Sequence, residues 1–208
     1  MCIRDSPNVV LLCGEEQYLV EWSAKQLIDK YINKACESLD FVRLDSAGLT
    51  IDKMKESCET LSMLSERRVV LIPEFPPALG QKLKGFSESD EKELIEYFSN
   101  LPETCLLIIT APATDGKTKK KSRLQTAVGK AGTVYDFDPL SGAQLRSFIA
   151  KRFKASGKIC RNSVIDLLIQ DSGYGNKDIE YNLYNLENDI KKIIAHSDGC
   201  LLYTSRCV

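Results

Sequence analysis

The sequence predicts an α/β fold, in which a parallel sheet is flanked by helices and followed by a smaller helical domain. Five short runs of apolar and β-branched residues alternate with amphipathic stretches of helical length, the pattern of a parallel sheet with right-handed crossovers. The first run leads directly into Gly14 and a helix-forming stretch, as in nucleotide-binding α/β proteins. After Pro139 only helical periodicities follow, so no further strand is predicted.

The strands are predicted from their apolar character. The run at 9–13 contains no polar residue, as expected for a strand that is covered on both faces. The run at 41–45 is a weaker candidate. In chain order, we predict strands at 9–13, 41–45, 68–72, 105–110 and 133–137.

Amphipathic stretches between these strands predict four helices. The first covers 16–34, with an inward stripe formed by Tyr18, Leu19, Trp22, Leu27, Ile28, Tyr31 and Ile32. The second carries the stripe Ile51, Met54, Cys58 and Leu61. The third is capped by Ser89 or Asp90 and carries Leu94, Ile95, Tyr97 and Phe98. The fourth, at 118–130, is short and basic.

Three further helices predict a small second domain. Ser141 and Asn162 are placed to cap the first two helices, and Gly157 and Gly173 to end them. The third helix runs from about residue 177 to 195. We therefore expect an α/β domain at 7–139 and a three-helix lid domain at 140–199. Residues 1–6 and 200–208 fit no neighbouring element, and we expect them to be non-native sequence.

Composition excludes several classes of protein. The net charge of −1 excludes a polycation that coats nucleic acid by bulk charge, so any contact with DNA needs a local patch or assembled partners. No apolar run approaches the ~20 residues of a membrane span, and the sequence shows no pattern typical of a signal peptide. The eight cysteines show no C-x-x-C spacing, and several fall in core patterns. We therefore expect reduced thiols and a cytoplasmic protein.

The junction after the first strand lacks the chemistry of a phosphate-binding loop. A G-x-x-x-x-G-K-[ST] motif starting at Gly14 would need Gly, Lys and Ser or Thr at the positions of Leu19, Val20 and Glu21. Glu15 and Glu16, within the same stretch, would repel a phosphate. The sequence therefore predicts a degenerate nucleotide site.

Other catalytic signals are missing as well. An ATPase ends its third strand with Asp-Glu to hold Mg²⁺ and orient water, but here Pro73 and Glu74 follow the strand. His196 is the only histidine, and nothing in the sequence places a nucleophile beside it. No catalytic residue, cofactor site or metal site is predicted.

A basic run follows the fourth strand. It is a candidate contact for a phosphate backbone or for an acidic partner surface, and the alternative is a solvated helix start. The candidate residues are Lys117, Lys119, Lys120, Lys121 and Arg123.

An apolar pair ends the second helix. If the helix runs to Ser65, Met63 and Leu64 lie away from the inward stripe that includes Leu61, and at least one of them projects outward. Adjacent exposed apolar residues suit insertion into a hydrophobic pocket of a partner. The alternative is a helix end that folds onto the sheet.

Taken together, these features resemble the delta subunit of the bacterial DNA polymerase III clamp loader. The resemblance spans about residues 8–199 and depends on the order and spacing of its segments. These are LLCGEEQYL at 11–19, LSMLSERRVV at 61–70, the lysine-rich stretch after the fourth strand, and DIEYNLYNLE at 178–187.

The resemblance implies an AAA+-like fold without ATPase activity, in a non-catalytic subunit of a DNA-directed DNA polymerase. Its partners would be the beta sliding clamp, the ATPase subunits of the clamp loader, and primer-template DNA through the assembled complex. The family opens the clamp by inserting an apolar pair from a helix end, which maps onto Met63 and Leu64, with Leu61 and Arg67 beside them. The resemblance also implies that the chain ends before a helical collar domain.

Two other functions remain open. One is a nucleotide-dependent enzyme with an atypical phosphate site. The other is a different non-ATPase subunit of such a loader, whose family carries a zinc-binding cysteine cluster and a Ser-Arg-Cys motif. The sequence matches that motif only at Ser205-Arg206-Cys207, in the tail.

Overall fold

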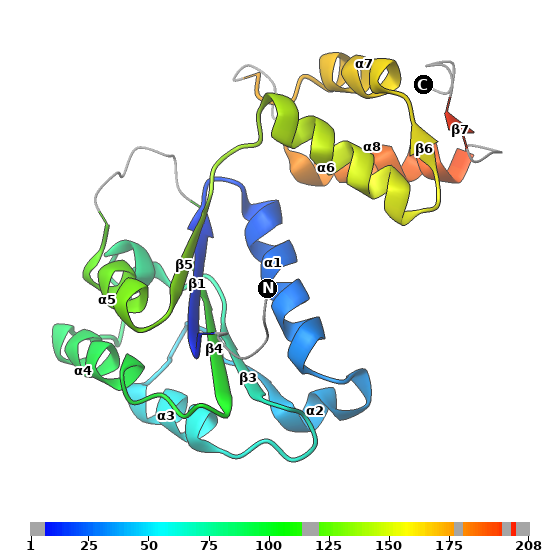
Figure 1. The fold of residues 1–208 in the computed structure, drawn as a ribbon. Helices are drawn as coiled ribbons and strands as arrows, with labels where there is room; N and C mark the ends of the chain where they lie inside the picture. The colour runs from blue at the N-terminus through cyan, green and yellow to red at the C-terminus, as the bar shows by residue number, and fades with distance from the viewer. Residues whose placement is uncertain (1–6, 114–120, 177–180, 197–200, 203–208) are drawn as a thin grey trace. The chain divides into compact units, whose positions relative to one another are not determined.

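The computed structural model describes residues 7–113, 121–176, 181–196 and 201–202. The chain forms two compact units, Met1–Asp138 and Pro139–Val208 (Figure 1). Within the described ranges, no helix is both long enough and apolar enough to cross a membrane.

The first unit is built on a five-stranded sheet with the strand order β2-β3-β4-β1-β5. All of its strand pairs are parallel, so the predicted α/β class with a parallel sheet is confirmed. The strands are β1 (Val9–Gly14), β2 (Phe41–Arg43), β3 (Arg68–Ile72), β4 (Cys105–Thr110) and β5 (Thr133–Phe137).

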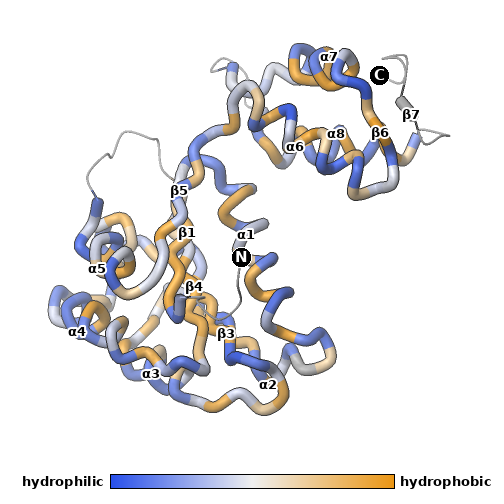
Figure 2. Tube along the Cα trace, in the orientation of Figure 1, coloured by the Kyte–Doolittle hydropathy of each residue, from blue (hydrophilic) through white to orange (hydrophobic). Residues whose placement is uncertain are grey.

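The three central strands are buried along their whole length, because helices cover both faces of the sheet. Alternate residues contribute to two separate cores. On β1, for example, Val9 and Leu11 belong to one core, and Val10 and Leu12 to the other. The hydropathy of the tube in Figure 2 is highest along these strands.

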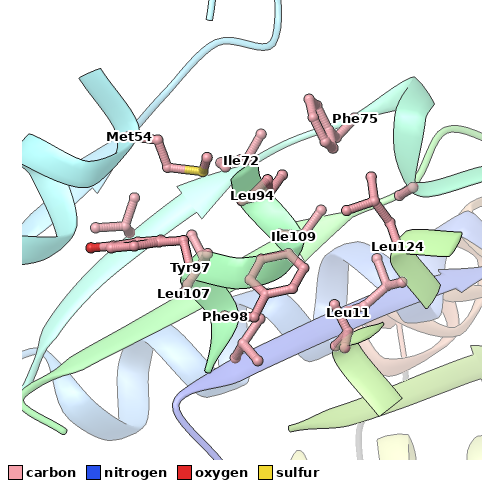
Figure 3. Close-up of a cluster of buried hydrophobic side chains, with 14 of the residues drawn as sticks. Leu11, Met54, Ile72, Phe75, Leu94, Tyr97, Phe98, Leu107, Ile109 and Leu124 are labelled. Carbon is pink, nitrogen blue, oxygen red and sulfur yellow. The ribbon is translucent and has the colours of Figure 1, made fainter. Parts of the chain in front are cut away.

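The helices divide between the two faces (Figure 1). Helix α1 (Gln17–Tyr31) packs on one face, and α3 (Ile51–Glu59), α4 (Glu88–Phe98) and α5 (Arg123–Ala131) pack on the other. Figure 3 shows the core between the sheet and α3, α4 and α5, in which Met54 of α3 and Leu94 of α4 meet the sheet. Short elements complete the unit: η2 (Lys34–Cys36), α2 (Glu37–Asp40) and η3 (Pro76–Leu79).

Two details of these helices differ from prediction. Ser87, rather than Ser89 or Asp90, is the N-cap of α4, and Asp90 completes a capping box with it. On α1, Tyr31 of the predicted stripe is buried together with Val20 and Ala24, and Leu27 and Ile28 are partly buried against the same core. Trp22, which the prediction also placed in the stripe, is 40% exposed.

The second unit contains α6 (Gly142–Ala155), α7 (Asn162–Ser172) and α8 (Leu183–His196). Their buried residues are Leu145, Ile149, Phe153, Ile165, Leu183, Leu186 and Ile190. Two short strands, β6 (Ile159–Cys160) and β7 (Leu201–Leu202), pair in parallel. The prediction of no strand after Pro139 was therefore wrong, and residues 201–202 of the 200–208 segment take part in this strand pair. Runs of two residues are too short to show a strand period.

Candidate functional site

The junction between β1 and α1, where a phosphate-binding loop would lie, is short and closed by its own contacts. Only Glu15 and Glu16 separate the two elements. The N–H of Glu16 donates to the carbonyl oxygen of Phe137 at 3.0 Å, and Gln17 Nε2 donates to the carbonyl oxygen of Gly14 at 2.9 Å. Gly14 has φ +130°, and a Cβ there would lie 2.4 Å from the Phe137 oxygen. These contacts tie the backbone to β5 where a phosphate cradle would need room.

The carboxyl end of β3 is likewise held by its own hydrogen bonds. Glu74 has a left-handed backbone with φ 46°, and its N–H donates to Thr110 Oγ1 at 2.9 Å. Pro73 fills the preceding position, so this junction carries a single carboxylate. In the part of the chain that the structure describes, no group of three or more His, Cys, Asp or Glu is placed to hold a metal ion.

An apolar loop lies at the opposite edge of the sheet. Parallel strands share one carboxyl edge, so the segment that enters β3 lies at the amino edge, away from the β1–α1 junction (Figure 1). Residues 61–67, named here the 61–67 loop, form this segment between α3 and β3. Leu61, Met63 and Leu64 are 70%, 72% and 68% exposed.

The loop begins earlier than the sequence predicted. Helix α3 ends at Glu59, and Thr60 is already extended, with its N–H and hydroxyl both donating to the carbonyl oxygen of Glu56. The prediction of an apolar helix end reaching Ser65, with Leu61 in the inward stripe, was therefore wrong. Thr60 is β-branched and its hydroxyl bonds the helix backbone, both of which favour a helix end.

The buried carboxylate of Asp40 holds the backbone of this loop. Asp40 is the last residue of α2 and is fully buried. Its Oδ1 accepts a hydrogen bond from the N–H of Met63 at 2.6 Å. Its Oδ2 accepts from the N–H of Leu64 at 3.0 Å and from that of Ser65 at 2.6 Å. One side chain therefore fixes three successive peptide units.

These contacts also set the charge of Asp40. Burial raises the pKa of the carboxyl, but the hydrogen bonds from Met63, Leu64 and Ser65 outweigh it and hold the pKa well below its usual range. Asp40 is therefore ionised at neutral pH, and its charge is stabilised by backbone N–H dipoles.

Ser62 closes the loop from within. Its Oγ donates to the carbonyl oxygen of Ser65 at 2.8 Å and lies 3.2 Å from the N–H of Ser65, which donates to it. The backbone groups are thus directed inward, and the side chains of Met63 and Leu64 project outward.

Arg68, at the start of β3, anchors the base of the loop. Its guanidinium is buried and donates from Nε to the carbonyl oxygen of Ser57 at 2.8 Å and from Nη1 to that of Leu39 at 3.0 Å. This joins the last turn of α3 to α2. Leu39 is 49% exposed and adjoins Asp40 in the chain.

Arg67 contacts its own domain. Its guanidinium carbon lies 5.7 Å from the centre of the Tyr31 ring, and Nη1 lies 3.4 Å from Asn8 Oδ1. The side chain is half-buried. The structure thus places Arg67 at the root of the loop rather than beside Met63 and Leu64 at its surface.

The basic run is described only at its end. Lys117, Lys119 and Lys120 lie outside the described residues. Lys121 and Arg123 are exposed at the start of α5 and line a groove of about 400 Å³ between α4 and α5. Helix α5 begins at Arg123 rather than near residue 118, because Ser122 and Gln125 form a capping box.

Sequence reasoning missed Asp40 and Leu39. The signal for Asp40 was weak: a single acidic residue at the start of a predicted strand. Leu39 lies in a stretch for which the sequence predicted no element. Their role becomes visible only when the fold places α2 beside the 61–67 loop.

Comparison with known proteins agrees with this fold. The family model for the delta subunit of DNA polymerase III matches residues 10–135. A curated relative, named Probable DNA polymerase III subunit delta, from Aquifex aeolicus (strain VF5), is 24% identical over 195 residues, covering 91% of this chain and 50% of its own length.

A solved structure gives the same result for the fold. The DNA clamp loader delta protein of Bacillus subtilis superimposes with a TM-score of 0.71 at 18% identity, over 95% of this chain and 56% of that protein. The chain thus spans about half the length of each relative. Since the family model covers more than half of the sequence, the chain belongs to the DNA polymerase III delta subunit family.

Proposed function

We propose that this chain binds a bacterial sliding clamp through Met63 and Leu64 and helps to open it, as a non-catalytic subunit of the clamp loader. One observation carries the proposal: two adjacent apolar side chains are 72% and 68% exposed on a loop whose backbone is fixed by a buried carboxylate. Membership of the delta subunit family supplies the partner.

The energetics suit an interaction of this kind. Exposed apolar side chains gain about 1.5–3 kcal/mol each when a partner's pocket removes them from water. A loop that already holds them in place loses little conformational entropy on binding. Such an interface can trap a clamp conformation in which the neighbouring ring interface is weakened.

The closed phosphate position supports a subunit without ATPase activity. The two-residue β1–α1 junction uses the N–H of Glu16 to bond Phe137, and the end of β3 offers Glu74 without a preceding Asp. ATP would therefore act in partner subunits of the loader, where it would expose or hide the 61–67 loop.

Two further contacts belong to the same proposal. Leu61 is exposed beside the apolar pair and would add contact area. The basic run that includes Lys121 and Arg123 would contact primer-template DNA or a partner subunit once the loader is assembled.

The test is binding of the full 208-residue chain to purified sliding clamps of Aquifex aeolicus and Bacillus subtilis, measured by calorimetry. We expect Met63→Ala combined with Leu64→Ala to weaken binding by about 3 kcal/mol, or roughly a hundredfold in Kd. Circular dichroism should stay unchanged, because both side chains are exposed.

Ile159→Ala is the matched control. It truncates an apolar side chain that is 62% exposed in the second unit, and it should leave the affinity unchanged. Equal affinity of the double variant and the unaltered chain would overturn the assignment of Met63 and Leu64.

A further inference from the structure

Asp40, in α2, is fully buried beneath the 61–67 loop. The side chains of the loop itself are all exposed or half-buried. Fixing a loop at a protein surface is unfavourable because it costs backbone conformational entropy. The described contacts of the apolar pair with the domain are backbone hydrogen bonds to Asp40, so the fixed loop geometry depends on that carboxylate.

We propose that Asp40 is a positioning residue for the clamp contact: its carboxylate fixes the peptide units of residues 63–65, so that Met63 and Leu64 are presented together. This inference rests on the proposed function of the apolar pair. Asp40 itself is fully buried and would not touch the partner.

The geometry explains why a carboxylate is required. Three N–H donors converge on two oxygens, at 2.6, 3.0 and 2.6 Å. An asparagine has the same shape but replaces one acceptor oxygen with an NH₂ donor, which would face at least one N–H of the loop. Asp40→Asn therefore disrupts at least one of the three positioning contacts while adding no volume.

The experiment is a double-mutant cycle on the full chain, with clamp affinity as the readout. We expect Asp40→Asn alone to weaken binding about tenfold or more, since the two apolar side chains must then be ordered on binding. In the Met63→Ala, Leu64→Ala background, Asp40→Asn should cause no further loss. Additive losses would overturn the proposal, because a merely structural role acts independently of the apolar pair.

Asp90→Asn is the matched control. Asp90 also accepts a backbone hydrogen bond, from Ser87 at 2.7 Å, but it caps α4. This variant should lower stability slightly and leave clamp affinity unchanged. An equal loss of affinity in both variants would mean that general destabilisation, and not positioning, is responsible.

Ser62→Ala keeps the test valid if Asp40→Asn fails to fold. It removes the Oγ that links Ser62 to Ser65 and leaves no buried charge unpaired. We expect it to loosen the same loop and to weaken clamp binding by a smaller factor, about threefold. Unchanged affinity would contradict the proposal.

Hydrogen exchange separates this inference from the proposed function. In the unaltered chain, the amide protons of Met63, Leu64 and Ser65 should exchange slowly, and Asp40→Asn should accelerate all three. If the apolar pair proves irrelevant to clamp binding, the proposed function fails, yet the exchange data still show whether Asp40 holds the loop. Fast exchange in the unaltered chain would overturn the inference directly.

Discussion

The environment of Asp40 shows how a buried charge is held without a cation. Its oxygens accept three backbone hydrogen bonds, and no described ion pair involves it. Hydrogen bonds to an ionised acceptor are shorter and stronger than those between neutral groups. In this loop, one buried carboxylate thus binds three successive backbone N–H groups.

This arrangement predicts a dependence of stability on pH. The folded pKa of Asp40 lies below the unfolded value of 3.8, so its contribution is present above pH 3.8 and is lost as the pH falls through the folded pKa. We expect the difference in unfolding free energy between the unaltered chain and Asp40→Asn to be largest near neutral pH and to shrink below pH 3.8. Urea unfolding at several pH values measures this difference, and a pH-independent value would contradict the prediction.

At the scale of elements, the end of α3 decides where the loop begins. Thr60 turns the chain into an extended conformation, and Arg68 binds the carbonyl oxygens of Ser57 and Leu39. The guanidinium therefore satisfies one carbonyl near the end of α3 and one in α2. One side chain at the end of the loop therefore links α3 to α2.

Arg68→Met should therefore destabilise the first unit. Methionine removes the hydrogen bonds from the buried guanidinium to the carbonyl oxygens of Ser57 and Leu39, which costs about 2–4 kcal/mol. Arg43→Met is the control, because Arg43 is exposed and lies 3.9 Å from Asp45, so its loss should change stability by about 0.5 kcal/mol or less. The check is the midpoint of urea unfolding; similar effects of both changes would refute the role of Arg68.

At the scale of the whole first unit, the two edges of the sheet differ in what they offer. The carboxyl edge is where open α/β sheets bind ligands, but here the β1–α1 junction is closed onto Phe137. The amino edge carries the exposed apolar loop instead. The exposed apolar side chains therefore lie at the end of the sheet opposite to the closed β1–α1 junction.

Mg-ATP tests this interpretation of the first unit. A nucleotide present at 100 times its Kd would stabilise the fold by about 2.7 kcal/mol, which raises the Tm by several degrees. We expect no rise in Tm with 1 mM Mg-ATP relative to a salt solution of equal ionic strength. A clear rise would instead favour the nucleotide-dependent enzyme.

The sequence by itself determined the fold class and predicted that at least one residue of the apolar pair projects outward. Continuous apolar runs such as 9–13 require a sheet covered on both faces, and the missing glycine and lysine after Gly14 follow from residue identity alone. Met63 and Leu64 were recognised because they fall off the inward stripe of a helix, although that helix proved to end at Glu59. Helix ends depend on local hydrogen bonds that periodicity does not register.

Only the tertiary structure decided what holds the loop and what lies beside it. Asp40 and Ser65 are 25 residues apart in the sequence. They meet because β2, the outermost strand of the sheet, pairs in parallel with β3, so that the segments preceding both strands lie side by side. Arg67 and Arg68 are adjacent in the chain, but successive side chains at the start of a strand point to opposite faces of the sheet. Arg67 therefore contacts the Tyr31 ring, and Arg68 bonds the carbonyl oxygens of Ser57 and Leu39. Contacts between distant segments depend on strand order, and a single sequence carries strand order only indirectly.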